Sequence, residues 1–312
     1  MTIDQVLEKA FTSASLASGG LLNPEQSARF VQAIIDNAVI SVEARREPMK
    51  ASKKQIDKLT FGSAILQKPT AVGTPHTVTT DPTASKVTLD AQEVIVAIDL
   101  GYDALEDSIE GNNLFDTILG MTAKRVAFDL DQLIIHGDAS GGTGTFLDVF
   151  DGVLHQITTN THPIAGVTGC TDANLAIALK KLPSRFFNNE SEWRFYVSHL
   201  ARLNYVECLA GKNVNDAFTR YLVEAKEPSY NGIPVRKVGA IKTYDVTGGG
   251  VNGSDGILIM PKNIVLGVHR DIMFEFERKP RARIIEVTMT MKADVKLEEE
   301  TACVKITGFK HT

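Results

Sequence analysis

The chain has 312 residues, of which 43% are hydrophobic and 23% charged, so it can bury a sizeable core in two domains or in one elaborated domain. Its net charge of −5 disfavours a nucleic-acid binder that works by neutralising many phosphates, because that affinity needs clustered Lys and Arg. No apolar run reaches the roughly 20 residues of a membrane helix, and the N-terminus lacks the basic-then-apolar order of a signal peptide. We therefore expect a soluble protein that is made in a reducing cytoplasm.

The first 22 residues are small and polar, and they have no core of their own. Asn23 and Pro24 then mark a helix start, since these are favoured residues at the N-cap and the first helical position. A charge run follows from Glu43 to Lys58. Its basic members are Arg45, Arg46, Lys50, Lys53, Lys54 and Lys58. Such a run is usually a solvated face, and the alternative is a specific electrostatic contact.

Residues 59–100 are rich in Thr, Val and Ile and are punctuated by Pro and Gly, which predicts two extended arms around a turn. The outer part, Lys68 to Lys86, has few large apolar residues and would be marginal as an isolated hairpin. We therefore expect this outer part to be either mobile or in contact with another chain. The returning arm, Glu93 to Leu100, is dense in Val and Ile and should join the main sheet.

A long amphipathic helix is predicted from Leu114 to His136, with Asn113 as its N-cap and Gly137 closing it in a left-handed conformation. At 1.5 Å per residue it spans roughly 34 Å, enough to join distant parts of the subunit. Its apolar stripe comprises Phe115, Ile118, Leu119, Val126, Leu130, Leu133 and Ile134. Its polar residues, expected away from the stripe, are Asp116, Lys124, Arg125, Asp129 and Asp131.

Residues 151–262 have the pattern of a separate α/β unit. The expected helices are Thr171 to Leu182, Leu200 to Leu209 and Asp216 to Ala225, and the expected strands are Arg194 to Ser198 and Ile257 to Met260. The tail returns to β structure, with strands Ile264 to Val268, Ile272 to Phe276 and Arg283 to Lys292. In the last strand apolar and polar residues alternate, which predicts a sheet with one face in water.

Motifs for catalysis or metal binding are weak in this sequence. The Gly-rich turn from Gly137 to Gly144 follows a helix and lacks a Lys-Ser/Thr pair, so it does not fit a phosphate-binding loop. The seven histidines show no HExxH pattern, and no GxSxG nucleophile turn is present. Cys170, Cys208 and Cys303 are odd in number and widely spaced, which favours buried, reduced thiols over disulfides or zinc. We predict no catalytic, cofactor-binding or metal-binding residues.

Two further features have structural interpretations that we favour. The acidic cluster Glu298, Glu299 and Glu300 could serve as metal ligands or as an acid/base pair, but neighbours on a strand point to opposite faces, so we expect a solvated strand end. Trp193, the only tryptophan, is expected to be a packed aromatic rather than a ligand platform.

The order of these parts resembles the major capsid proteins of tailed bacteriophages that share the HK97-type fold. Five stretches carry the resemblance: Val87 to Ile109, Ala123 to Gly142, Asp151 to Leu154, Asn231 to Val235 and Gly256 to Glu277. Each motif is degenerate alone, but together they cover nearly the whole chain in order. The turn after the long helix is richer in Gly than is usual in the family.

The resemblance implies an α+β fold with five parts. These are an N-terminal arm (1–56), an extended β-hairpin loop (57–100), a peripheral domain with a long spine helix (101–150), an axial α/β domain (151–262) and peripheral return strands (263–312). No Lys and Asn pair can be assigned to the covalent cross-link that some members form, so no cross-link residue is carried over.

The implied function is assembly. Hexamers and pentamers would form an icosahedral phage head around double-stranded DNA, with the hairpin and the N-terminal arm lying over adjacent subunits. The implied partners are the chain itself, a portal protein, a decoration protein and packaged DNA without sequence-specific contact, with no membrane. Since the sequence begins at Met1 with the arm, we expect a separate scaffolding protein, or none. The expected location is the virion capsid, assembled in the host bacterial cytoplasm.

Contacts between subunits are predicted for the charge run, where Arg45, Arg46, Lys53, Lys54 and Lys58 would meet acidic neighbours. Two other functions stay open. An encapsulin nanocompartment has the same fold but encloses a cargo protein, and a soluble oligomeric enzyme or binding protein would need a pocket for a ligand.

Overall fold

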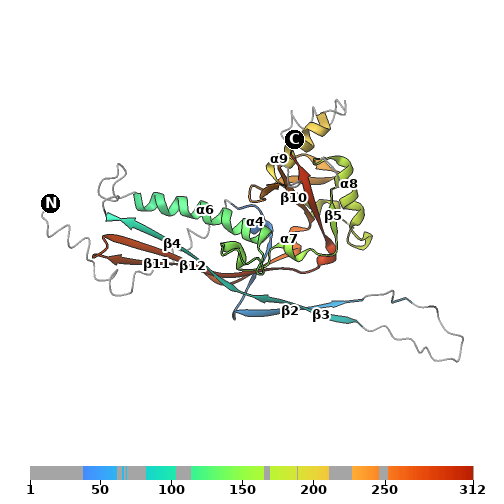
Figure 1. Ribbon diagram of the computed structural model, residues 1–312. Helices are drawn as coiled ribbons and strands as arrows, with labels where there is room; N and C mark the ends of the chain where they lie inside the picture. Colours follow the sequence, from blue (N-terminus) through green and yellow to red (C-terminus); the bar gives the residue numbers. More distant parts are fainter. Residues whose placement is uncertain are drawn as a thin grey trace, which may run out of the picture.

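The computed structural model describes residues 38–61, 65–66, 68, 82–102, 114–164, 169–187, 189–210, 227–245 and 252–311. Within them the strands form a four-stranded, a seven-stranded and a two-stranded sheet. The four-stranded sheet runs beside the long helix α6, the seven-stranded sheet lies at the upper right, and the two-stranded hairpin extends to the lower right (Figure 1). The predicted α+β class is confirmed. The predicted helices at Asn23 and at Asp216 to Ala225, and the Asn113 cap, lie outside the described residues.

The four-stranded sheet belongs to the peripheral domain, and its order is β1-β11-β12-β4. Its strands are β1 (Arg45–Pro48), β4 (Gln92–Gly101), β11 (Ile264–Lys279) and β12 (Ile284–Leu297). The predicted alternation in β12 is confirmed, because Val287, Met289 and Met291 are buried and the residues between them are partly exposed. One face therefore joins the core shared with α6, and the other meets solvent.

The long helix α6 extends over Leu114–His136, the predicted bounds. Val126, Leu130, Leu133 and Ile134 of the predicted stripe are buried. Asp131 was expected on the polar face, and this is wrong: its side chain is 3% exposed. The buried face of α6 is wider than the predicted stripe, and it includes this position.

The end of α6 closes by a different mechanism from the one predicted. Gly137 does not have a left-handed conformation; the glycines with positive φ nearby are Gly142 and Gly144. Its need for glycine comes from close backbone contact, since a Cβ there would lie 2.2 Å from Phe150 O, and the Gly152 amide donates to Gly137 O at 2.8 Å. The chain doubles back tightly at this point.

The seven-stranded sheet belongs to the axial domain, with order β5-β13-β10-β6-β8-β7 and β9 paired to β10. Its strands are β5 (Thr161–Pro163), β6 (Arg194–Val197), β7 (Ser229–Tyr230), β8 (Ile233–Lys237), β9 (Thr243–Asp245), β10 (Asn252–Ile259) and β13 (Cys303–Lys310). Helices α8 (Asp172–Lys181) and α9 (His199–Ala210) correspond to two predicted helices. Trp193 is fully buried beside Phe187, as expected of a packed aromatic.

Two strand predictions need correction. The expected strands Ile264 to Val268 and Ile272 to Phe276 are one strand, β11, in which register shifts between Val268 and Met273 replace the predicted break. The C-terminal strand β13 pairs with β10 and β5 of the axial sheet, so the tail after Leu297 does not lie with the peripheral strands. An apolar pattern predicts burial of a strand face but not the sheet that the strand joins.

The remaining short helices mark the connections. They are α4 (Ile40–Glu43), α7 (Val153–Gln156), and the 3₁₀ turns Phe146–Asp148, Ser184–Phe186, Glu190–Glu192, Pro261–Asn263 and Glu300–Ala302. In the described part of the chain, three connections pass between the two domains, at α7, at Pro261–Asn263 and at Glu300–Ala302. The two-stranded hairpin consists of β2 (Lys53–Thr60) and β3 (Thr83–Asp90), paired from Lys53↔Asp90 to Thr60↔Thr83.

Candidate assembly elements

The base of the hairpin is fixed to the peripheral sheet by a small core of its own. Met49, Leu89, Ala91 and Val265 are buried together, with Ile56 packed against them. Gly267 of β11 makes room for this core, because a Cβ there would lie 2.7 Å from Met49 Sδ. The hairpin is therefore anchored at its base, and β2 and β3 project away from the rest of the subunit (Figure 1). Most of the predicted outer part, Lys68 to Lys86, lies outside the described residues.

Buried Asp294 strengthens this anchor at the bend between β3 and β4. Its carboxylate accepts hydrogen bonds from the backbone amides of Asp90 and Val295, both at 2.8 Å. Burial raises the pKa of Asp294 despite these bonds. Through these hydrogen bonds Asp294 of β12 fixes the end of β3, at the base of the hairpin, to the peripheral sheet.

The acidic cluster Glu298–Glu300 is where the hairpin meets the connection between the two domains. Arg45 Nη1 lies 2.7 Å from Glu298, and Lys58 of the hairpin pairs with Glu299. Burial alone would raise the pKa of Glu299, but the bonds from Lys58 and Thr301 outweigh it and hold the pKa below its usual range. The expected solvated strand end is thus a set of engaged carboxylates.

The connections on either side of this cluster are bonded to one another. Glu300 accepts four hydrogen bonds from the amides and hydroxyls of Thr158 and Thr159. The side chain of buried Asn263 donates to Glu299 O and accepts from the Glu299 amide, at 2.9 and 2.8 Å. Gln156 donates to Val295 O and accepts from the Leu297 amide. All three crossings between the domains are cross-linked by hydrogen bonds.

Residues 39–47, which we name the strap, connect the spine helix, the axial domain and the hairpin. Asp131 of α6 accepts from the amides of Val39, Ile40 and Ser41 at 2.8, 3.3 and 3.1 Å. Further along the strap, Glu43 accepts from the Tyr196 hydroxyl of β6 and pairs with Arg236 of β8. At its end, Glu47 pairs with Lys54 at 2.5 Å, a contact that lowers the pKa of Glu47. One short segment thus bridges every major part of the subunit.

The structure places the five predicted inter-subunit residues close together around the hairpin base, and gives four of them partners in the same chain. Arg45 pairs with Glu298, Lys53 with Asp90, Lys54 with Glu47 and Lys58 with Glu299. Among the described residues Arg46 forms no ion pair, and it is exposed. Contacts of these residues with another subunit remain a prediction, and Arg46 is the member that is free to make one without exchanging a partner.

The end of β2 and the residues just after it expose apolar side chains that no described part of the subunit covers. Leu59, Phe61, Ile65 and Leu66 are 72%, 51%, 55% and 95% exposed. Across the strand pair, Leu59 is opposite Ala84, which is also exposed. Large apolar side chains gathered on a projecting element indicate a contact with another molecule.

Groups that could perform chemistry are sparse in the described part of the chain. Asp138, Asp151 and His155 lie near one another, with His155 Nδ1 3.7 Å from Asp138 and Nε2 4.0 Å from Asp151, a spacing of loose ion pairs. All three cysteines are unbridged, as predicted, but only Cys170 and Cys303 are buried, and Cys208 is partly exposed. Burial raises the pKa of Cys303 to about 12. Neither group has the features of an activated centre.

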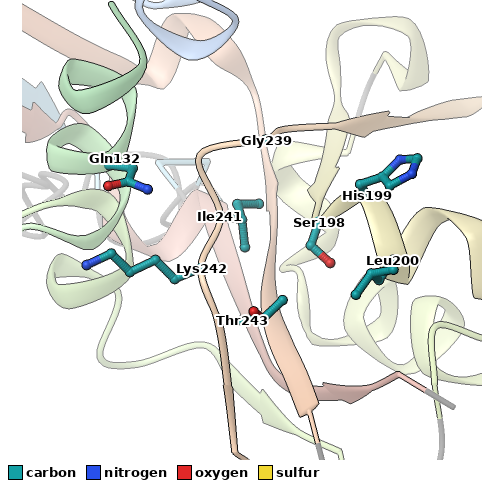
Figure 2. Close-up of a pocket in the computed structure, with 8 residues that line it drawn as sticks. All are labelled: Gln132, Ser198, His199, Leu200, Gly239, Ile241, Lys242 and Thr243. Atoms are coloured by element: carbon teal, nitrogen blue, oxygen red, sulfur yellow. The ribbon is translucent and has the colours of Figure 1, made fainter. Parts of the chain in front are cut away.

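A hollow of about 420 Å³ lies where the spine helix faces the axial domain. Figure 2 shows Gln132 and Lys242 on one side and His199 and Leu200 on the other, with Ser198 between. The Ser198 hydroxyl is engaged with Ser254 Oγ and the Ala201 amide. The lining has no nucleophile paired with a base, so this space fits a gap between two domains better than an active site.

Several of these residues escaped the sequence analysis. Asp131 had a usable signal, since it lies four residues after Ala127 and three before Ile134, which are both fully buried, so its carboxylate falls within a helical apolar stripe. Glu43 was recognised only as part of a charge run. Asn263 and Asp294 had no signal, because nothing local shows that the loop and strand that hold them are buried.

Comparison with known proteins decides the family. No protein-family model matches the chain. The chain is 32% identical, over 99% of its own length and 100% of the relative's, to YqbE of Bacillus subtilis (strain 168), a protein named as a prophage capsid protein. The chain belongs to the phage capsid protein family. It is a structural shell protein, and its place is the capsid.

Solved capsid structures confirm the HK97-type fold. The satellite phage P4 procapsid, which includes the size-determination protein Sid, gives a TM-score of 0.64 at 12% identity and covers 98% of this chain and 97% of that one. The capsid of cyanophage P-SCSP1u gives 0.61 at 11% identity, covering 86% and 87%. The SrpI encapsulin complex from Synechococcus elongatus PCC 7942 gives 0.59 at 8% identity, covering 86% of both chains. The fold alone is thus shared by capsids and an encapsulin, whereas the full-length relative is a capsid protein.

No helix in the described part of this capsid protein has the length and apolar character to cross a membrane.

Proposed function

We propose that this protein assembles as hexamers and pentamers into the icosahedral head of a tailed phage, which encloses double-stranded DNA. The full-length relationship to a prophage capsid protein carries this proposal. The exposed side chains of Leu59, Phe61 and Leu66 support it, because apolar surface of this kind favours a partner and the described part of the subunit leaves it uncovered. Its role is structural rather than enzymatic.

In this assembly the hairpin of β2 and β3 lies over an adjacent subunit. The predicted bounds change accordingly, because β1 of the predicted arm (1–56) and β4 of the predicted hairpin (57–100) belong to the four-stranded sheet of their own subunit. Leu59, Phe61, Ile65 and Leu66 would be buried against the neighbour. At roughly 25 cal/mol per Å² of apolar area, burying such side chains stabilises each contact by several kcal/mol before ordering costs. Obligate interfaces of this kind are large, so many individually weak contacts together resist the packaged genome.

The basic residues at the hairpin base are proposed as contacts between subunits, with unequal roles. Arg46 is the one without an ion pair among the described residues, whereas Arg45, Lys53, Lys54 and Lys58 would have to exchange or share their partners. Reversing Arg46 to Glu should therefore impair shell formation and leave the subunit folded. Reversing Lys53 and Lys54 together should also impair shells, but with some loss of subunit stability from the broken internal pairs.

Other partners follow from the family. They are a portal protein, a separate scaffolding protein, a decoration protein on the outer face, and packaged DNA bound without sequence preference. Assembly would take place in the cytoplasm of a bacterial host. The net charge of −5 agrees with loose contact to DNA rather than tight binding of the backbone.

Negative-stain electron microscopy of the purified protein, with sedimentation of the same sample, tests this function. Closed shells, or rings of five and six subunits, are expected. A uniform monomer or dimer, even when a scaffolding protein is supplied, would refute it.

The second candidate is an encapsulin shell, favoured by the structural likeness to the SrpI encapsulin complex. Genomic neighbours separate the two: terminase, portal and scaffold genes accompany a phage head, and a cargo enzyme gene accompanies an encapsulin. Shells that contain a single cargo protein and no DNA would favour the encapsulin.

A further inference from the structure

Figure 1 shows the end of the four-stranded sheet that lies farthest from the seven-stranded sheet, where β11 and β12 meet. The strands at this end carry carboxylates in an unusual arrangement. Glu277 of β11 lies opposite Glu286 of β12, which in turn lies opposite Asp99 of β4. Glu275 lies two residues before Glu277 in β11, so its side chain is on the same face, and it is exposed. We name these four residues the acidic row. Like charges directly opposite one another destabilise a sheet, so this arrangement lowers the stability of the isolated subunit.

One cation partly compensates the acidic row. Lys279 Nζ lies 2.6 Å from Glu286, and the bond to Glu286, followed by the charges of Glu286, Glu277 and Asp99, raises the pKa of Lys279. In the described part of the chain, Asp99, Glu275 and Glu277 form no ion pair of their own. The face therefore keeps unbalanced negative charge.

Basic residues lie directly beside the acidic row in the sequence. The turn that joins β11 to β12 has the sequence Arg278-Lys279-Pro280-Arg281-Ala282-Arg283. Arg278 and Arg281 are both exposed, and neither forms an ion pair within the described residues. We name this segment the basic turn. The same tip thus presents three carboxylates, Asp99, Glu275 and Glu277, and two guanidinium groups, Arg278 and Arg281, that form no ion pair within the described residues.

We propose that the tip of the peripheral domain is a charge-paired contact between copies of this chain, in which the basic turn of one subunit lies on the acidic row of the next. This inference rests on the proposed shell function and names one of its interfaces. A second copy is the occupant because its own tip carries the complementary charge, Arg278 and Arg281 for the acidic row of its neighbour.

The contact is heterologous, since a turn meets a sheet face. Repeating it by rotation closes a ring, whereas repeating it without closure would give a filament. Arg suits this role, because its planar guanidinium can bond carboxylates with two parallel hydrogen bonds and remains charged at any working pH. Charges of this kind contribute more to the choice and register of the partner than to raw affinity.

A charge-swap experiment on the full chain tests the proposal. The acidic-row variant carries Asp99→Lys and Glu277→Lys, the basic-turn variant carries Arg278→Glu and Arg281→Glu, and the combined variant carries all four changes. Shell yield is measured by sedimentation and negative-stain microscopy beside wild type. Each double variant should lower the yield about tenfold or more, and the combined variant should restore most of it.

Folding of the variants is checked separately. The acidic-row variant places opposite charges across from Glu286, so its melting temperature as an unassembled subunit should be no lower than wild type. Failure of that variant to assemble cannot then be attributed to unfolding. If the basic-turn variant does not fold, Arg278→Gln with Arg281→Gln replaces it, with a lower shell yield expected in the same assay.

The possible outcomes separate the inference from the function on which it rests. Double variants that assemble like wild type would overturn the tip contact. Two defective variants whose combination stays defective while folded would also overturn it, since the charges would then meet a different partner. If wild type itself forms no shells, the proposed function fails first.

Discussion

Replacing Asp131 should release the strap from the spine helix. The carboxylate accepts three backbone hydrogen bonds and is 3% exposed, and the residues that donate two of them, Ile40 and Ser41, are each 1% exposed. Asp131→Ala leaves these buried donors without acceptors, at about 1 to 3 kcal/mol each. The higher helix propensity of Ala recovers about 0.5 kcal/mol. The net expectation is a loss of about 2 to 4 kcal/mol in the free energy of unfolding.

Urea unfolding of unassembled subunits measures this loss, since subunit contacts would otherwise add to the apparent stability. Asp131→Asn keeps one carbonyl acceptor and should lose about half as much. Asp129→Ala is the matched control on the same helix, because Asp129 makes a surface pair with Arg125 that is worth about 0.5 kcal/mol or less. Hydrogen exchange at the amides of residues 39–41 should accelerate in the Ala variant alone.

Two results would refute this reasoning. One is an Asp131→Ala subunit within 0.5 kcal/mol of the Asp129→Ala control, about the size of a single surface pair. The other is unchanged protection of the residue 39–41 amides, which would show that packing of the strap, and not the carboxylate, holds it in place.

Three more changes test other parts of the fold. Gly137→Ala, just after the end of α6, should lower the free energy of unfolding by about 3 kcal/mol or more, because its Cβ would lie 2.2 Å from a backbone atom. Gly120→Ala, within α6, meets nothing within 4 Å and should raise the free energy of unfolding by about 0.5 to 1 kcal/mol. Thermal unfolding measures both changes. A double-mutant cycle of Lys58→Met and Glu299→Gln should give a coupling energy of about 1 to 2 kcal/mol, since both side chains are three-quarters buried or more. Burial, with the charges of Lys242 and Lys305, lowers the pKa of His136 from 6.5 to about 4 in the folded subunit. Between these two pH values the unfolded chain binds a proton that the folded subunit does not bind. The free energy of unfolding should therefore fall by up to about 3 kcal/mol as the pH drops from 6.5 towards 4.

Each of these has a matched comparison. The exposed pair Lys86–Asp57, at 3.7 Å, should give a coupling energy near zero, and equal coupling in both cycles would contradict the role of burial. His136→Gln can still accept the hydrogen bond from the Lys242 amide but does not titrate, so it should flatten the pH dependence. An unchanged slope in that variant would assign the titration to another group. A Gly137→Ala subunit as stable as wild type would mean that the backbone there relaxes freely.

The sequence was most informative where one residue pattern extends over many positions. The helix Leu114–His136 was predicted with its bounds because apolar residues recur at helical spacing over several turns. The solvent-facing side of β12 was predicted from the alternation of apolar and polar residues. The order of parts led to the fold, although no single stretch would have done so.

What could not be predicted depends on pairing between distant segments. The Gly137 contact is with Phe150, and the Asp131 contacts are with residues about 90 positions earlier in the chain. The basic residues at the hairpin base were correctly recognised as a group, but their partners Glu298 and Glu299 lie 240 positions or more away. Local sequence shows the charge of such a side chain and not which distant carboxylate it reaches.

The three crossings between the domains have a mechanical consequence. A domain joined by one covalent linker can swivel about it, and tension concentrates on that single chain. Here three covalent segments run in parallel, and Gln156, Asn263 and Glu300 fasten them side by side. A force that pulls the domains apart is thus divided among three segments of the chain. Because hydrogen bonds hold these segments side by side, they also resist rotation of one domain relative to the other.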